Sequence, residues 1–190
     1  MIILASASPR RQQLLDMLGI EYEIDPAEID ERPERGELPE TLAVRLAREK
    51  SVTVAQRHSG FPVLAADTVV VIDGVVLGKP TTDAEAVQML RMLSGRQHVV
   101  VTAVALTCDG ETHELCDVTR VWFRALDDEF IRQYIATGEP LDKAGGYAVQ
   151  GRGSVMVQRI EGDFFGVMGL PVRLVVSLLQ AAGIPYRFTR

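Results

Sequence analysis

The sequence predicts an α/β fold in which a mixed β-sheet is flanked by helices. Apolar runs typical of buried strands alternate along the chain with segments that carry helical apolar stripes. Two Asp-Gly pairs, Asp73-Gly74 and Asp109-Gly110, stand between neighbouring apolar runs and indicate β-hairpins. Hairpins pair strands antiparallel and helical crossovers join parallel strands, so the two signals together favour a mixed sheet.

Local signals mark where each element begins. Ser8 is a good N-cap, and the proline after it suits the first turn of a helix. Thr82 and Glu85 have the spacing of a capping box, and the apolar run at Val63–Ile72 is typical of a strand buried on both faces. In chain order we expect a strand at 2–5, a helix at 9–19, a loop at 25–40, a helix at 41–57, strands at 63–72 and 75–77, a helix at 82–93, paired strands at 99–107 and 114–123, a helix at 128–136, a loop at 137–153, a strand at 155–160 and a last helix from 171 to 183.

Length and charge limit the classes of function. With 190 residues, the chain is expected to form a single domain over residues 1–190. The net charge of −6 and the aromatic content of 6% argue against a nucleic-acid binder, which needs a basic surface and stacking side chains. The acidic charge and the lack of a long apolar stretch argue against a membrane protein. Two cysteines, Cys108 and Cys116, and a start without the apolar core of a signal peptide lead us to expect a cytoplasmic protein.

Arg10 and Arg11 stand in the first turn of the first predicted helix, where the helix dipole is already positive. Each cation there costs about 0.3–1 kcal/mol relative to a neutral residue. A bound polyanion would reverse that sign, because helix N-termini and arginine side chains both bind phosphate well. The residues alone leave open the alternative of two solvated arginines.

Lys50 and Asp67 are charged residues at apolar positions. Lys50 is in line with Leu42 and Leu46 on the apolar stripe of its helix, so its ammonium either extends to water or points into a cleft. Asp67 lies within an apolar strand, where a carboxylate requires a cation, a metal or several donors. Such a group is a candidate metal ligand or general base, and the alternative is a structural carboxylate that caps a neighbouring loop.

Two loops carry further candidates for binding. The segment 78–80 is not a P-loop, because a proline follows Lys79 where Ser or Thr is required, so this lysine is at most an isolated cation that faces phosphate. The loop at 139–151 has two adjacent glycines, Tyr147 and Gln150, which suit close approach to a ligand. The amide of Gln150 could read a base edge, because it both donates and accepts hydrogen bonds. The alternative is a surface loop with its own ion pairs.

Together these segments resemble the Maf family of nucleoside triphosphate pyrophosphatases, and the similarity runs along essentially the whole chain. It depends on six motifs that stand in the family's order. They are LASASPRR at 4–11, AREK at 47–50, ADTVV at 66–70, GKP at 78–80, LSG at 93–95 and the loop at 139–151. Each motif alone is weak, but the six in order are highly specific.

The resemblance implies an elongated mixed sheet with two lobes and a central cleft, similar to inosine triphosphate pyrophosphatases. It also implies that a nucleoside triphosphate is hydrolysed to the monophosphate and diphosphate with a divalent metal, Mg²⁺ or Mn²⁺. The family's proton acceptor for the attacking water matches Asp67. The phosphate site implied by the resemblance consists of Ser8, Arg10, Arg11, Lys50 and Lys79. Candidate metal ligands are Asp67 and Glu31; Asp30 and Glu31 are both candidates for the second carboxylate, and solvated loop charges are the alternative for each.

Three positions separate the branches of this family. This chain has Arg10, Thr68 and Gln150, as in the branch that acts on dTTP and UTP, whereas the branch that acts on 7-methyl-GTP has Tyr, Gln and Glu there. We therefore expect pyrimidine triphosphates as substrates, with modified pyrimidine nucleotides as further candidates. Relatives are often homodimers, and the resemblance extends that expectation to this chain.

The family also offers an alternative function. Some members are linked to septum formation and arrest of cell division, so a nucleotide-binding regulator without catalysis is the second hypothesis. The presence of Asp67 argues against it, because a protein that only binds nucleotides does not need the proton acceptor.

Overall fold

The computed structural model describes residues 1–188, which form two compact units. Unit 1 comprises Met1–Asp67, Thr102–Asp117 and the residues from Gly169 onward, and unit 2 comprises Thr68–Val101 and Val118–Met168. The chain passes between the units at four places, three of which lie inside β-strands. Continuous strands rather than loops therefore join the units at these three places.

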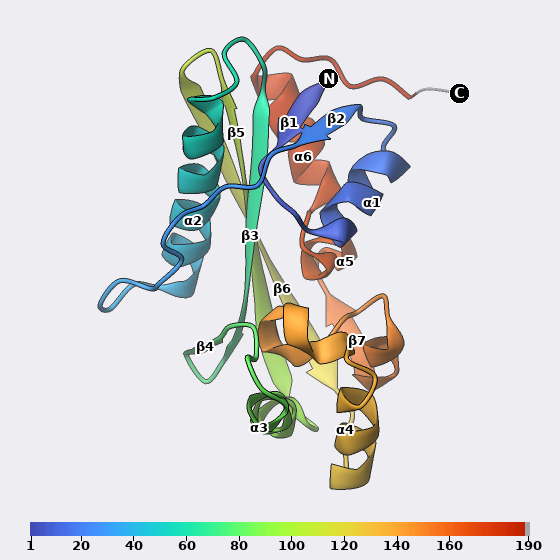
Figure 1. Ribbon diagram of the computed structural model, residues 1–190. Coiled ribbons are helices and arrows are strands. Elements are labelled where there is room, and N and C mark those ends of the chain that lie inside the picture. The colour runs from blue at the N-terminus through green and yellow to red at the C-terminus, as the bar shows by residue number, and fades with distance from the viewer. Residues whose placement is uncertain (189–190) are drawn as a thin grey trace. The chain divides into compact units, whose positions relative to one another are not determined.

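The strands of the described residues form one seven-stranded mixed sheet (Figure 1). They are β1 Ile2–Leu4, β2 Tyr22–Ile24, β3 Val63–Ile72, β4 Val75–Leu77, β5 Gln97–Cys108, β6 Glu111–Phe123 and β7 Val157–Glu161. The order is β2-β1-β3-β5-β6-β7, and β4 pairs with β3. β1 is parallel to β2 and β3, whereas the pairs β3–β4 and β6–β7 are antiparallel. The predicted fold class, a mixed sheet with flanking helices, is confirmed.

Helices and short 3₁₀ segments connect these strands. The α-helices are α1 Pro9–Met17, α2 Pro39–Ala55, α3 Asp83–Leu93, α4 Asp128–Ile135, α5 Phe164–Met168 and α6 Val172–Ala181. The 3₁₀ segments are η1 Glu139–Asp142, η2 Ala144–Gly146 and η3 Arg152–Met156. At the start of α3 the Thr82 side chain accepts the N–H of Glu85, so the predicted cap forms.

Both predicted hairpin turns have the left-handed backbone that a two-residue turn requires. Asp73 and Gly74 have φ of 51° and 76°, and Asp109 and Gly110 have φ of 50° and 83°. Positive φ at both central residues matches the right-handed twist of the flanking strands. The second turn joins β5 and β6, which are 12 and 13 residues long.

Some boundaries differ from the sequence prediction. β2 and α5 were not predicted, because segments of three and five residues are too short to show a period. α2 begins at Pro39 rather than residue 41, since proline fits the first helical turn. β7 begins at Val157 rather than residue 155, because residues 152–156 form a 3₁₀ segment.

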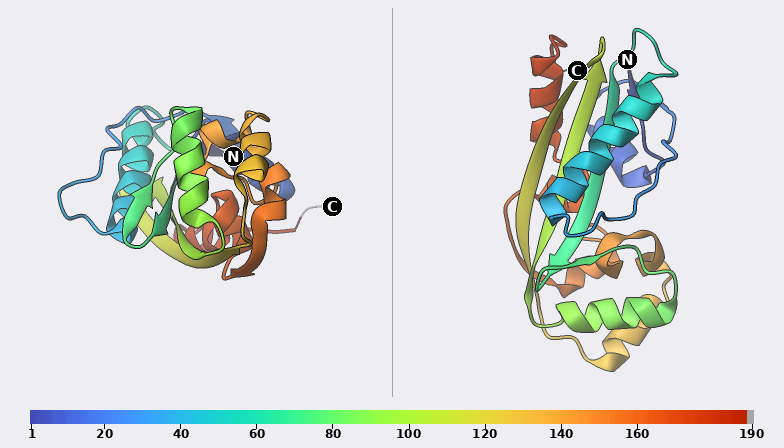
Figure 2. Two further views of the ribbon diagram at one scale, coloured as in Figure 1. Left: turned by 90° about the horizontal axis from the view of Figure 1, so that it is seen from below. Right: turned by 90° about the vertical axis from the view of Figure 1, so that its left-hand side faces the viewer.

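In unit 1, helices cover both faces of the strands. Val54 of α2 packs with Ile3, Val63 and Ala65, which point to one face of β1 and β3. The alternate residue Leu64 is also fully buried. The right-hand view of Figure 2 shows α2 and α6 on opposite sides of the strands. The start of β3 is therefore buried on both faces.

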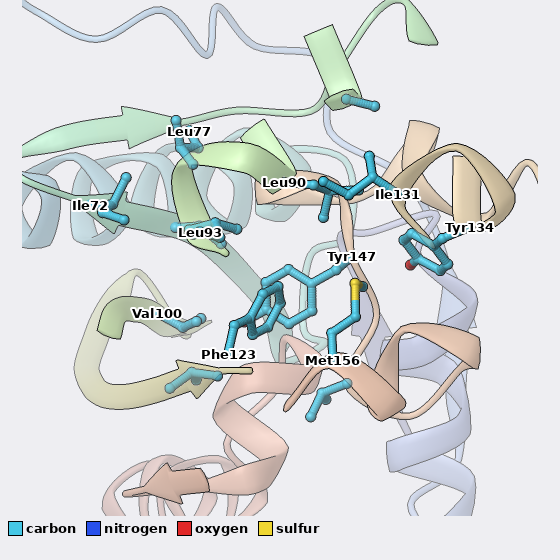
Figure 3. Close-up of a cluster of buried hydrophobic side chains, with 14 of the residues drawn as sticks. Ile72, Leu77, Leu90, Leu93, Val100, Phe123, Ile131, Tyr134, Tyr147 and Met156 are labelled. Carbon is cyan, nitrogen blue, oxygen red and sulfur yellow. The ribbon is translucent and has the colours of Figure 1, made fainter. Parts of the chain in front are cut away.

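Unit 2 has its own core, in which α3, α4 and the loop after α4 pack on the strands. Figure 3 shows Phe123 of β6 and Tyr147 of the loop against each other, with Met156 beside them. The two rings meet edge to face with centroids 4.7 Å apart. The His98 ring contacts both, and its Nε2 lies 2.8 Å from the Tyr147 hydroxyl. This packing fixes the residues that precede Gln150.

Candidate active site

The start of α1 presents its arginines from a fixed turn. Ser8 is the N-cap with extended backbone, and its N–H donates to the Ser6 hydroxyl at 3.2 Å. The same hydroxyl accepts from Arg11 Nη1 at 3.0 Å, and Arg11 Nε donates to the Gly169 carbonyl at 2.9 Å. Two contacts on different sides hold the guanidinium in one orientation, as a preorganised anion site requires.

Three charged groups of unit 1 act on the guanidinium of Arg11. Burial lowers the pKa of the Arg11 guanidinium, and the charge of Asp67 opposes that effect. Arg10 lowers the same pKa further and Glu31 raises it. Asp67 of β3 and Glu31 of the acidic loop therefore lie within electrostatic range of Arg11 in the α1 turn.

Lys50 connects the two carboxylates of this group. Its Nζ lies 2.7 Å from Asp67 Oδ1 and 2.7 Å from Glu31 Oε1. Lys50 and Asp67 are only 8% and 7% exposed, so the ammonium does not extend to water. Of the two orientations that the sequence left open for Lys50, the structure has the inward one. The cation that Asp67 needs in an apolar strand is the side chain of Lys50.

The acidic loop holds Glu31 at Lys50 through its own contacts. Arg45 of α2 donates to Glu37 at 2.7 Å and to the carbonyl of Arg32 at 3.2 Å, which ties the loop to the helix. The neighbouring Asp30 is exposed and is paired with Arg32. The hydrogen bonds from Arg32 lower the pKa of the Asp30 carboxyl to about 2. Of the two candidate second carboxylates, Glu31 is therefore the one that lies at Lys50.

The remaining predicted site residues belong to unit 2. Thr68 follows Asp67 on β3 and is half-buried, whereas Lys79 and Gln150 are exposed in loops. Gly145, at φ 68°, donates its N–H to the Gly78 carbonyl at 3.0 Å, so the two loops touch. The structure thus brings the segments of Lys79 and Gln150 together within unit 2.

Sequence reasoning missed the groups that support these side chains. Ser6 was seen only as part of a motif, and Gly169 gave no signal, because a backbone carbonyl that accepts from Arg11 leaves no trace in residue type. Glu139 was seen only as part of a loop, yet its carboxylate accepts the N–H groups of Arg152 and Gly153.

A divalent metal fits the carboxylate pair of unit 1. Within residues 1–188, no three His, Cys, Asp or Glu side chains gather closely enough to form a metal cluster. Mg²⁺, however, is usually bound by one or two carboxylates together with phosphate oxygens and water. Asp67 and Glu31 already share one cation, the ammonium of Lys50, so their donor chemistry suits this kind of site.

A sequence profile of the family described as "Maf-like protein" matches residues 1–182 of the chain. The chain belongs to the Maf family. A Maf relative from Syntrophomonas wolfei named dTTP/UTP pyrophosphatase is 51% identical, over 95% of this chain and 96% of the relative. A relative of the same name from Myxococcus xanthus is 50% identical, over 97% of this chain and 94% of the relative. The resemblance noted in the sequence is confirmed.

Among solved structures, the Staphylococcus aureus Ham1 protein is similar to this Maf chain in fold. The TM-score is 0.51 over 95% of this chain and 98% of the other, with 13% sequence identity. At that identity the likeness shows the fold alone. Among residues 1–188, none of the helices combines the length and the apolar character needed to cross a membrane.

Proposed function

We propose that this chain hydrolyses dTTP and UTP to the monophosphate and diphosphate. The observation that carries the proposal is the buried Lys50–Asp67 pair with Glu31, within electrostatic range of Arg11. The names of the Maf relatives support the same reaction. Modified pyrimidine triphosphates are further candidate substrates of the same site.

In the proposed reaction, Asp67 takes a proton from water. The water oxygen forms a bond to the α-phosphorus while the anhydride bond between the α- and β-phosphates breaks, and diphosphate leaves. Before substrate binds, the ammonium of Lys50 donates to the carboxylates of both Asp67 and Glu31. In the proposed complex this ammonium would also attract the polyphosphate. A unit charge pair at about 4 Å is worth about 4 kcal/mol at an effective dielectric near 20.

The arginines and the metal complete the proposed site. Arg11, fixed by Ser6 and Gly169, and Arg10 in the same turn would hold the phosphates, with Ser8 at the start of that turn. A divalent metal held by Asp67 and Glu31 would supply charge neutralisation on the phosphates and a more acidic water. Lys79 would add a further cation from its loop.

Base selection is assigned to Arg10, Thr68 and Gln150. The exposed amide of Gln150 can donate to and accept from a pyrimidine edge. The loop that carries it rests on the Phe123–Tyr147 packing, so its backbone is well fixed. Selectivity for a base by hydrogen bonds requires such a rigid support.

The proposal is tested by diphosphate release from the purified protein with Mg²⁺ or Mn²⁺. The nucleotides are dTTP, UTP, CTP, 7-methyl-GTP and modified uridine triphosphates. We expect dTTP and UTP to be the best substrates of this panel. Preference for 7-methyl-GTP would overturn the assignment of the base, and no release with any nucleotide would favour a regulator without catalysis.

The Asp67→Asn variant tests the proton acceptor. It should still bind dTTP while kcat falls by about 10²–10⁴-fold, the usual contribution of a general base. The matched control is Asp73→Asn, which changes an exposed aspartate in the turn at the end of the same strand and should leave kcat unchanged. Near-normal kcat in Asp67→Asn would contradict the assignment.

A further inference from the structure

The loop around Gln150 is built on one carboxylate of unit 2. Glu139 Oε1 accepts the N–H of Gly153 at 2.9 Å, and Oε2 accepts the N–H of Arg152 at 2.9 Å. Oε1 also accepts the hydroxyl of Tyr134 on α4 at 2.9 Å. Three donors thus converge on the Glu139 carboxylate, and two of them, Arg152 and Gly153, lie more than ten residues later in the sequence.

Glu139 and Tyr134 contact the backbone on both sides of Gln150. Before it, the N–H of Ala148 donates to the Tyr134 hydroxyl at 3.3 Å. After it, the N–H groups of Arg152 and Gly153 donate to Glu139. The backbone that enters and the backbone that leaves Gln150 are therefore fixed by the same two side chains.

The two glycines after Gln150 are required by this close approach. A Cβ at Gly151 would lie 2.5 Å from Glu139 Oε2. A Cβ at Gly153 would lie 2.8 Å from the Tyr134 hydroxyl and 2.8 Å from the Ala148 carbonyl. No side chain fits at either position without moving the carboxylate or the ring, so the glycines and the pair form one packed unit.

The carboxylate is held in place and charged. The backbone of Glu139 is anchored as well. The Glu139 carbonyl accepts a hydrogen bond from Lys143 Nζ at 2.7 Å, and the Glu139 N–H donates to the Thr137 hydroxyl at 3.2 Å. Burial alone would raise the pKa of the Glu139 carboxyl. The N–H groups of Gly153 and Arg152, the Tyr134 hydroxyl and the charge of Lys143 together outweigh burial and hold that pKa below its usual value. Both carboxylate oxygens of Glu139 accept hydrogen bonds from the protein, so this side chain holds the conformation of the loop.

We propose that Glu139 and Tyr134 are positioning residues for Gln150 and thereby set the selectivity for the pyrimidine base. This inference rests on the proposed function, because Gln150 is the base-recognition residue there. Neither side chain is assigned a contact with substrate. Their effect is transmitted through the backbone of residues 148–153, whose position decides where the amide of Gln150 can reach.

The test compares Glu139→Gln and Tyr134→Phe with the wild-type protein. The matched control is Glu129→Gln, the same change at an exposed glutamate of α4 that pairs with Arg132 and Gln133. We expect the KM for dTTP to rise about tenfold in Glu139→Gln, while kcat and the inhibition constant of inorganic tripolyphosphate, which lacks a base, change less than about twofold. A tenfold change corresponds to about 1.4 kcal/mol. Tyr134→Phe removes a single hydroxyl and should raise the same KM at least threefold, which keeps the test valid if Glu139→Gln does not fold.

A double-mutant cycle separates positioning from general destabilisation. In a Gln150→Ala background, Glu139→Gln should change the KM for dTTP less than twofold, because the side chain that it positions is gone. Multiplicative effects of the two changes would overturn the inference, as would parallel weakening of dTTP and tripolyphosphate. An active wild type whose variants match it would also overturn the positioning role. Absence of dTTP turnover by the wild type would instead overturn the proposed function, so the two failures are distinct.

Discussion

Replacing Lys50 by methionine removes a buried ammonium and leaves two carboxylates without it. The Nζ atom lies 2.7 Å from both Asp67 Oδ1 and Glu31 Oε1. Removing one partner of a buried pair typically costs about 3–5 kcal/mol, because the other charge stays buried. The Glu31 side chain is 53% exposed, so water can replace its contact, and Arg11 still acts on Asp67. We therefore expect the free energy of unfolding to fall by about 3 kcal/mol, at the lower end of that range.

Urea unfolding at pH 7.5 with a chelator measures this loss. The matched control is Lys79→Met, the same change at an exposed loop lysine, where a surface substitution should cost less than about 0.5 kcal/mol. The slope of the free energy with urea should be the same in all variants, since a changed slope would indicate a changed unfolded state. A loss in Lys50→Met no larger than in Lys79→Met would refute the buried-pair argument.

The same variant tests which residues would hold a divalent metal. Without the ammonium, Asp67 and Glu31 should bind Mn²⁺ more tightly in the absence of nucleotide. A ligand that binds only the folded state raises stability in proportion to RT ln(1 + [L]/Kd). Added Mn²⁺ should therefore stabilise Lys50→Met more than the wild type. An equal effect of Mn²⁺ on both proteins, or an undiminished effect when Asp67→Asn is added, would count against this carboxylate pair as the metal ligands.

Three further predictions concern unit 2. Burial lowers the pKa of His98 to about 4, from an ordinary 6.5, so the unfolded state takes up the proton first as the pH falls. The free energy of unfolding should therefore decrease between pH 6.5 and 4 by up to about 1.4 kcal/mol per pH unit. The His98→Asn variant should flatten that slope in urea titrations. Phe123→Ala removes the ring packed on Tyr147 and should cost about 3–5 kcal/mol in the same assay; a loss below about 1 kcal/mol would contradict the packing. Gly145→Ala places a Cβ about 3 Å from Val70 at a positive φ, and should lower the thermal midpoint.

The fold was predictable where local signals were strong. The run at 63–72 became β3 with the predicted bounds, and both Asp-Gly turns formed hairpins. The short strand β2 was missed because its three residues are stabilised by pairing with β1, which no local pattern records. Tertiary pairing, rather than propensity, decides such segments.

The candidate site was predictable as single residues but not as contacts. Lys50 and Asp67 stood out because each is charged among apolar neighbours, and they pair across two elements. The choice of Glu31 over Asp30 depends on which carboxylate Arg32 occupies, a matter of loop geometry. The loop that begins at Glu139 does contain an ion pair, Lys143 with Asp142, but no sequence pattern indicated that the Glu139 carboxylate accepts the N–H groups of Arg152 and Gly153. The roles of the phosphate-binding and specificity residues stay predictions.

The strands that run through both units have a consequence for folding. β5 and β6 are joined by only Asp109 and Gly110, so their pairing is local in sequence and closes with little loss of chain entropy. The parallel pair β1–β3, in contrast, joins residues about 60 positions apart, and such contacts form late. Because β5 and β6 each contribute residues to unit 1 and unit 2, early formation of this hairpin would form part of both units at the same time. We expect the two units to lose their structure in one cooperative transition rather than as separately melting domains.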